Sequence, residues 1–202
     1  RFYPDDAETF SIAALVAERQ GNELLAKQQA QLALAINPDH VESNLILGTL
    51  DLKAGEIEAA LQRAGSLSDE GERGVQLFQL NALVKTMDIN RIAPYIESLI
   101  VQRPEDSELY LGLAGQYAQF DQVAAGRDVM RRLLETAEDP KAHEDAYLSY
   151  VAQYQGPEAA LAALDELRAK APDRLDLDVL KATALLALES QGKGDREETF
   201  KL

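Results

Sequence analysis

A short motif occurs twice in the chain, as PDDAE at residues 4–8 and as PDHVE at residues 38–42, 34 residues apart. In each copy an aspartate, Asp5 or Asp39, stands three residues before a glutamate, which is the pattern of a capped helix start. Further prolines follow at positions 104, 140 and 172, close to multiples of the same period. A period of 34 residues indicates an array of similar units rather than one irregular domain.

Glycines and alanines repeat with the same spacing as the motif. Gly21 and Gly55 are 34 residues apart, and so are Ala26 and Ala60. On both sides of each glycine the apolar residues recur at helical intervals, and no stretch alternates long enough to form a strand. Each unit is therefore predicted to be a helix, a short turn, a second helix and a turn marked by proline. The predicted fold class is all-α.

The period divides the chain into successive helix pairs. The predicted units are residues 7–40, 41–72, 73–106, 107–140, 141–174 and a partial unit at 175–202. Small residues allow two helices to approach closely, so Ala60 is expected where the helices of the second unit cross. Three glycines between residues 65 and 74 predict a loose joint. Asn90 is expected to cap the helix that contains Pro94. Pro94 would then lie in the first turn of that helix, where proline is tolerated.

This pattern resembles the tetratricopeptide repeat (TPR), whose unit favours a small residue in the first helix (helix A), a glycine at the turn, alanines in the second helix (helix B) and a closing proline. The second unit matches best, through Gly48, Gly55 and Ala60. The fourth unit departs, because Gly126 stands where helix B is expected to have an alanine. The resemblance implies a right-handed superhelical solenoid of antiparallel helix hairpins that binds other proteins.

Charge and composition exclude several classes of function. With 35 acidic and 20 basic side chains, the chain has a net charge of −15, which argues against nucleic acid or an anionic membrane as a partner. The absence of cysteine excludes disulfides, thiolate catalysis and cysteine-ligated metals. No run of 18 apolar residues is present, so we expect no direct membrane insertion.

The residues that most often carry catalysis or bind metals form no convincing pattern. The two histidines, His40 and His143, stand beside turn prolines and are interpreted as solvated turn or cap residues. Asp173, Asp176 and Asp178 lack the glycine and glutamate of a calcium loop, so they are expected to supply negative charge at a helix start. The sequence therefore predicts no catalytic residue, no metal and no cofactor. We expect that the protein is not an enzyme.

Tyrosines form a stripe near the C-terminal end. Tyr147, Tyr150 and Tyr154 are spaced as neighbours on one helix face. Packing between helices is the favoured interpretation. The alternative is a partly exposed platform for a peptide or a sugar.

The TPR resemblance implies that a partner lies along the helices A, at positions 2, 5, 9, 12 and 13 of each unit. The predicted partner-binding residues are Glu18, Arg19, Leu45, Thr49, Leu52, Lys53, Leu111, Gln119, Asp145, Ser149 and Gln153. They describe a small, apolar and mildly acidic groove that favours another protein with a basic and apolar segment. The Lys/Asn/Arg set with which one TPR subgroup holds acidic chaperone tails is not present at these positions.

The predicted function is a non-catalytic scaffold in a multi-protein assembly. The pattern resembles TPR arrays of bacterial envelope systems, including polysaccharide export, which implies the periplasm rather than the cytoplasm. The chain opens inside a closing turn and ends early in a helix, so it is expected to be a fragment. Two alternatives remain open: a recruiting or regulatory module of an enzyme whose catalytic domain lies elsewhere, and a direct glycan binder. The sequence does not determine the oligomeric state.

Overall fold

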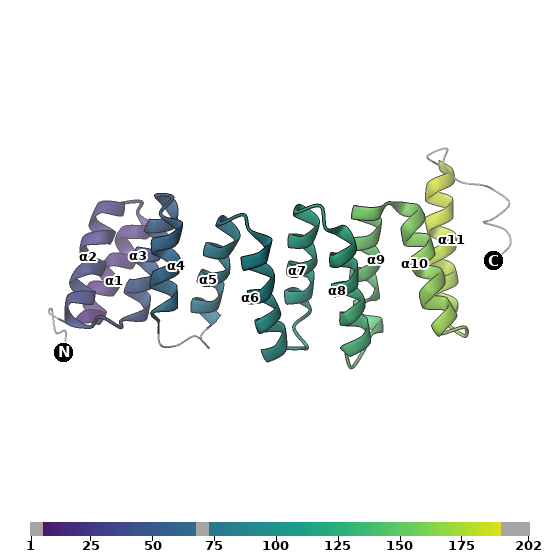
Figure 1. Ribbon diagram of the computed structural model, residues 1–202, viewed down its shortest axis with the longest axis horizontal. Coiled ribbons are helices and arrows are strands. Elements are labelled where there is room, and N and C mark those ends of the chain that lie inside the picture. Colours follow the sequence, from purple (N-terminus) through teal and green to yellow (C-terminus); the bar gives the residue numbers. More distant parts are fainter. Residues whose placement is uncertain (1–5, 68–72, 191–202) are drawn as a thin grey trace. The chain divides into compact units, whose positions relative to one another are not determined.

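The computed structural model describes residues 6–67 and 73–190, and these residues form helices joined by short turns (Figure 1). The helices are α1 (Ala7–Arg19), α2 (Glu23–Ile36), α3 (Val41–Lys53), α4 (Ile57–Gly65), α5 (Arg73–Lys85), α6 (Ile89–Gln102), α7 (Ser107–Gln119), α8 (Val123–Thr136), α9 (Lys141–Gln155), α10 (Pro157–Lys170) and α11 (Leu175–Ser190). Consecutive helices pack as hairpins, which confirms the predicted all-α fold of helix pairs.

The helices form two compact units, residues 1–95 (unit 1) and residues 96–202 (unit 2). The division falls inside α6. Each of the five complete ranges expected from the sequence holds one pair of helices, from α1 and α2 to α9 and α10, and α11 is the helix that the described residues of the sixth range form. Within the described ranges, no helix is long and apolar enough to cross a membrane.

The first helix of each of the first two pairs begins two residues after the aspartate expected to cap it, and the residue between them is the cap. The Asp6 carboxylate accepts the Thr9 N–H at 2.6 Å, and the His40 Nδ1 accepts the Ser43 N–H at 3.4 Å. Both caps have extended backbones, which lets their side chains turn back onto the first helical turn. The bond to Thr9 holds the pKa of Asp6 below its ordinary value. The motif predicted the helix starts to within one residue but named the wrong caps.

The expected cap of α6 was also wrong. The helix begins at Ile89, and the Asp88 carboxylate accepts the Asn90 N–H at 3.0 Å. Asn90 is therefore inside the first turn, and Pro94 lies in the helix interior. Because proline has no N–H, α6 lacks one backbone hydrogen bond at that point.

Two glycine turns connect the helices as the repeat pattern predicts. Gly21 and Gly55 have φ values of 73° and 83°, in the left-handed region that glycine adopts without a steric penalty. The predicted loose joint lies between α4, which ends at Gly65, and α5, which begins at Arg73. Its residues 68–72 are outside the described part of the chain.

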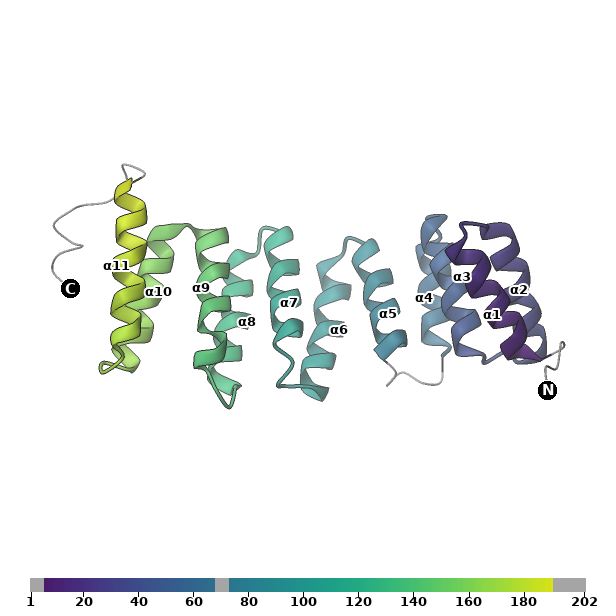
Figure 2. The ribbon, with the colours of Figure 1, turned by 180° about the vertical axis from the view of Figure 1, so that it is seen from behind.

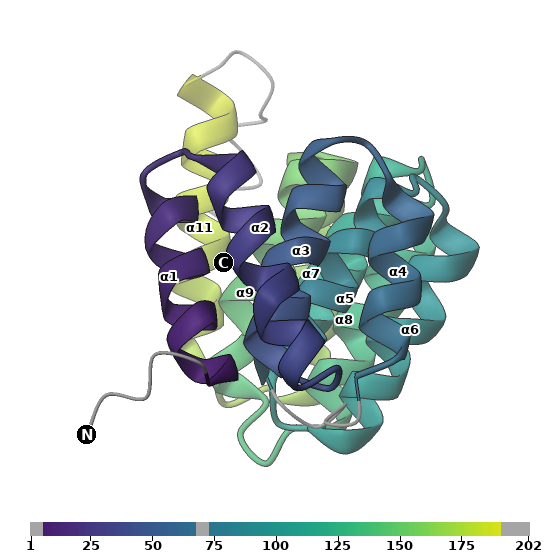
Figure 3. The same cartoon turned by 90° about the vertical axis from the view of Figure 1, so that its left-hand side faces the viewer.

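Alanines form much of the core of unit 1. Helix α2 contacts both α1 and α3 (Figure 3), and Ala14, Ala26 and Ala30 are fully buried there. Ala60 is also fully buried, in a cluster with Ala64 and Phe78. This burial agrees with its predicted place at a helix crossing.

A tyrosine explains the departure of the fourth repeat from the TPR pattern. The Tyr150 hydroxyl on α9 is 3.3 Å from the carbonyl oxygen of Ala114 on α7 and 3.2 Å from that of Val123 on α8. A methyl group on Gly126 would overlap this hydroxyl and come within 2.8 Å of the Ala114 carbonyl oxygen. Glycine is therefore required where three helices meet.

The two tyrosines nearest this junction are core residues, as the favoured interpretation of the stripe predicted. Tyr147 and Tyr150 are 2% and 5% exposed, and burial raises the pKa of Tyr150. Tyr154 is 39% exposed, with its ring centroid 4.8 Å from that of Tyr150. A sugar platform would therefore have only one of the three rings available.

Candidate partner-binding surface

In unit 2, the first helices of successive pairs share one side. Figure 2 shows α9 in front of α8 and α11 in front of α10, and α7 contacts α9. All five residues predicted to bind a partner in this unit are exposed: Leu111 and Gln119 on α7, and Asp145, Ser149 and Gln153 on α9. We call the surface at positions 2, 5, 9, 12 and 13 of these helices the A face of unit 2.

Small residues leave part of the A face of unit 2 without bulky side chains. Gly115 on α7 occupies one of its positions, with Gly112 beside it, and Ala152 is exposed on α9. A methyl group added to Gly112 or Gly115 would meet no other atom within 4 Å. The open space over these two residues is where the backbone of a bound segment could approach the helix closely.

Helix α11 extends the A face with apolar side chains that the sequence-based prediction missed. The same register places Val179, Thr183 and Leu186 at positions 5, 9 and 12 of the sixth unit. Val179 is 65% exposed and Leu186 is 52% exposed, and the Thr183 hydroxyl donates to the Val179 carbonyl. The 34-residue spacing from Asp145 and Ser149 was the signal that could have identified them.

The charged side chains on this face are acidic. Glu108 and Asp145 are exposed. Asp176 belongs to the same register, but its carboxylate accepts two hydrogen bonds from Arg174, at 2.6 and 3.2 Å. These bonds hold the pKa of Asp176 below its ordinary value. Glu108 and Asp145 are therefore the carboxylates best placed to attract a basic partner segment.

In unit 1, ion pairs engage part of the predicted surface. The Lys53 amine lies 3.3 Å from a Glu18 carboxylate oxygen and 3.8 Å from that of Glu23. Arg19 is exposed at the end of α1. Lys53 and Glu18 neutralise one another, which lowers the charge that unit 1 can offer to a partner.

The other predicted residues of unit 1 lie at the edge of its core. Leu45 and Leu52 are half-buried and pack against the cluster that contains Ala60 and Phe78. The Thr49 hydroxyl donates to the Leu45 carbonyl at 2.8 Å. These three side chains stabilise the packing of α3, so only part of each is open to a partner.

Helix α5 presents residues that sequence reasoning did not select. Leu77 and Asn81 occupy positions 5 and 9 of the third unit, and both are exposed. This unit keeps few of the TPR residues, so it gave no motif from which to choose them. The 34-residue period of the array was the remaining signal that could have identified them.

The two histidines belong to helix starts. His40 is only 9% exposed, and its Nε2 lies 3.3 Å from a Glu8 carboxylate oxygen. His143 is half-buried in the first turn of α9. His40 is therefore a cap, as expected, but a buried rather than a solvated one. Among the residues that the structure describes, no three His, Asp or Glu side chains gather as potential metal ligands.

Comparisons with known proteins support the fold. No protein-family model and no curated protein matches the chain. A TPR protein from Thermus thermophilus is similar in structure, with a TM-score of 0.50 and 20% identity over 89% of this chain and 99% of that one. A TPR protein from Parabacteroides merdae has a TM-score of 0.58 and 15% identity, over 93% and 74% of the two chains.

A third similar structure is YrrB, a TPR protein with an unusual peptide-binding site. Its TM-score is 0.53, with 18% identity over 88% of this chain and 92% of that one. The chain therefore has the TPR fold, which the resemblance of its sequence predicted.

Proposed function

We propose that the chain is a non-catalytic scaffold that binds a segment of a partner protein along the A face of unit 2. One observation carries this proposal: exposed side chains recur at the same position of three successive first helices, as Leu111, Asp145 and Val179 do at position 5. Their core-facing neighbours hold the helices together, so these exposed residues are free to contact a partner. YrrB, which has the same fold, has a peptide-binding site.

The chemistry of the A face selects a segment with apolar and basic residues. Val179 and Leu186 offer apolar surface that is half or more exposed. Glu108 and Asp145 attract positive charge, which also speeds the encounter of the two proteins. A strongly acidic segment would be repelled by these residues and by the net charge of −15.

We place the scaffold in a bacterial multi-protein assembly such as one for polysaccharide export. The similarity to TPR proteins of Thermus thermophilus and Parabacteroides merdae supports a bacterial setting. The exported polysaccharide is then not the ligand of the A face, which binds a protein of the assembly.

Affinity capture with matched variants tests the proposal. The wild-type chain and the Leu111→Arg, Ser149→Arg and Ala124→Arg variants are immobilised, and the proteins retained from a bacterial lysate are identified by mass spectrometry. Ala124 is exposed on α8 and is not one of the A-face positions, so its variant adds the same charge as a control. We expect a partner that the control retains and both A-face variants lose. A partner retained equally by all four proteins would refute a role for this face.

A further inference from the structure

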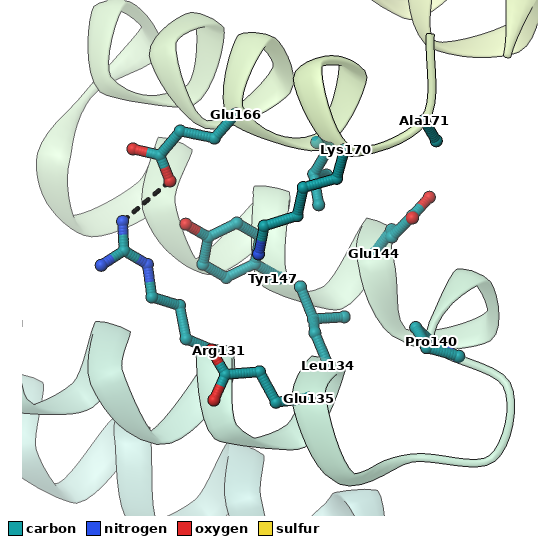
Figure 4. A pocket seen from close by; sticks show the side chains of 10 residues that line it. Arg131, Leu134, Glu135, Pro140, Glu144, Tyr147, Glu166, Lys170 and Ala171 are labelled. Atoms are coloured by element: carbon teal, nitrogen blue, oxygen red, sulfur yellow. Dashed lines mark hydrogen bonds and ion pairs between the residues drawn. The ribbon is translucent and has the colours of Figure 1, made fainter. Parts of the chain in front are cut away.

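Unit 2 has a cavity on the side of α9 that points away from the A face. Its volume is about 260 Å³, and residues of α8, α9, α10 and the adjoining turns line it (Figure 4). Tyr147 forms part of its wall and comes two residues after Asp145 of the A face. Two helical residues are separated by about 200° around the helix axis. The cavity and the A face are therefore separate surfaces.

The lining suits one large apolar side chain. The wall includes Leu134, Pro140, Leu167 and Ala171 together with Tyr147. Small-molecule sites usually have volumes of about 300–1,000 Å³, so this cavity is too small for most whole ligands. A single buried anchor residue of a protein partner commonly fills a pocket of this kind.

Ion pairs already neutralise most of the charged groups at the rim. Glu166 accepts hydrogen bonds from Arg131 at 2.8 Å and from Arg127 at 3.3 Å. Glu144 accepts one from Arg174 at 2.7 Å. These bonds fix the rim, because each links two helices or a helix and a turn.

Two opposite charges at the rim remain available. Lys170 on α10 and Glu135 on α8 are exposed, and neither has an ion-pair partner among the residues described. In Figure 4, Lys170 extends from α10 on the side of Tyr147, and Glu135 projects from α8. A partner residue at the α10 side would therefore meet a positive charge, and one at the α8 side a negative charge.

The cavity continues into a shallow depression between α8 and α10. This depression has a volume of about 450 Å³ and shares Arg131, Glu135, Glu166 and Lys170 with the cavity. The shared rim means that a chain segment lying in the depression can place a side chain in the cavity.

We propose that this surface is a second protein-binding site. A partner segment lies between α8 and α10 and inserts one leucine or aromatic side chain into the cavity, with an acidic residue facing Lys170 and a basic residue facing Glu135. The site does not depend on the A face, so the scaffold can hold two partners on opposite sides of unit 2.

A peptide selection tests the site. A displayed library of random 12-residue peptides is first depleted on an Ala171→Phe variant, in which the new ring fills the cavity, and is then selected on the wild-type chain. We expect the enriched peptides to share a large apolar residue flanked by an acidic and a basic residue. Changing that apolar residue to alanine should weaken the peptide's Kd at least tenfold, measured by fluorescence anisotropy.

Charge exchange checks the proposed orientation. Lys170→Glu should weaken the selected peptide severalfold, and a peptide with lysine in place of its acidic residue should recover that loss. Ala152→Phe adds the same ring to the exposed A face of α9, on the side away from the cavity, and should bind like the wild type. Circular dichroism identical to the wild type shows that Ala171→Phe is folded.

Three results would overturn the second site. One is that no peptide is enriched after the depletion. Another is that the enriched peptides bind Ala171→Phe as tightly as the wild type, and the third is that they lose affinity on Leu111→Arg, which would place them on the A face. Failure of the capture experiment would not affect the result of the peptide selection, because the A face is blocked at Leu111 and Ser149 and the cavity at Ala171.

Discussion

Replacing Gly126 by alanine perturbs the junction of α7, α8 and α9 directly. The added methyl group would overlap the Tyr150 hydroxyl and approach the Ala114 carbonyl oxygen, a backbone atom that cannot rotate away. Overpacking of this kind costs about 1–3 kcal/mol, and displacing the hydroxyl loses a hydrogen bond of about 1 kcal/mol. Alanine recovers about 1 kcal/mol through its higher helix propensity. We expect a net loss of about 2 kcal/mol.

Urea denaturation followed by circular dichroism measures this loss. Gly115→Ala is the matched control, because the same substitution on α7 meets no other atom within 4 Å. The control should therefore be more stable than the wild type by up to about 1 kcal/mol. The two substitutions are expected to differ in sign. If Gly126→Ala were as stable as the wild type or more so, the reasoning from the Tyr150 contact would be refuted.

Three further predictions concern unit 1. Ala60→Arg should lower the melting temperature by more than about 10 °C, because a charged side chain has no room in a fully buried position; an unchanged melting temperature would contradict its place at the crossing. Gly48→Ala should destabilise the chain by about 1–2 kcal/mol in urea, because the methyl group would overlap the Phe78 ring, and adding Phe78→Leu should restore part of the loss. Asp6→Ala should lower stability at pH 7, and the difference from the wild type should shrink below about pH 4. The folded-state pKa of Asp6 is depressed by its bond to Thr9, so the stabilisation exists only while the carboxylate is charged; a pH-independent difference would show that the charge has no role.

The architecture was predictable because it depends on a period rather than on single contacts. Gly21 and Gly55 repeat at 34 residues, and so do the apolar positions of the helices that they separate. In a helical array with that period, each pair of helices buries its apolar face against the next pair. The helix boundaries in the structure follow the period closely.

Features that depend on one contact were not predictable. Nothing in the sequence places the Tyr150 hydroxyl beside Gly126, because the two residues belong to different repeats. The caps Asp6 and His40 differ from the expected ones by one residue, since the choice depends on backbone angles at the turn.

The candidate surfaces also combine features that the sequence predicts with features that it does not. Exposure of Leu111, Asp145 and Ser149 followed from the register. The half-burial of Leu45 depends on its contact with the cluster around Phe78. The position of Leu45 in the repeat does not predict that contact. The cavity beside Tyr147 is formed by the packing of three helices, so no spacing in the sequence announces it.

Site-specific photo-crosslinking in the source cell is the most direct test of the central claim. Benzoylphenylalanine is introduced at Ser149 on the A face and, separately, at Ala124 on α8. We expect the Ser149 position to crosslink one partner protein through a segment with basic and apolar residues, and the Ala124 position not to crosslink that segment. Crosslinks to the same segment from both positions, or from Ala124 alone, would contradict binding along the A face.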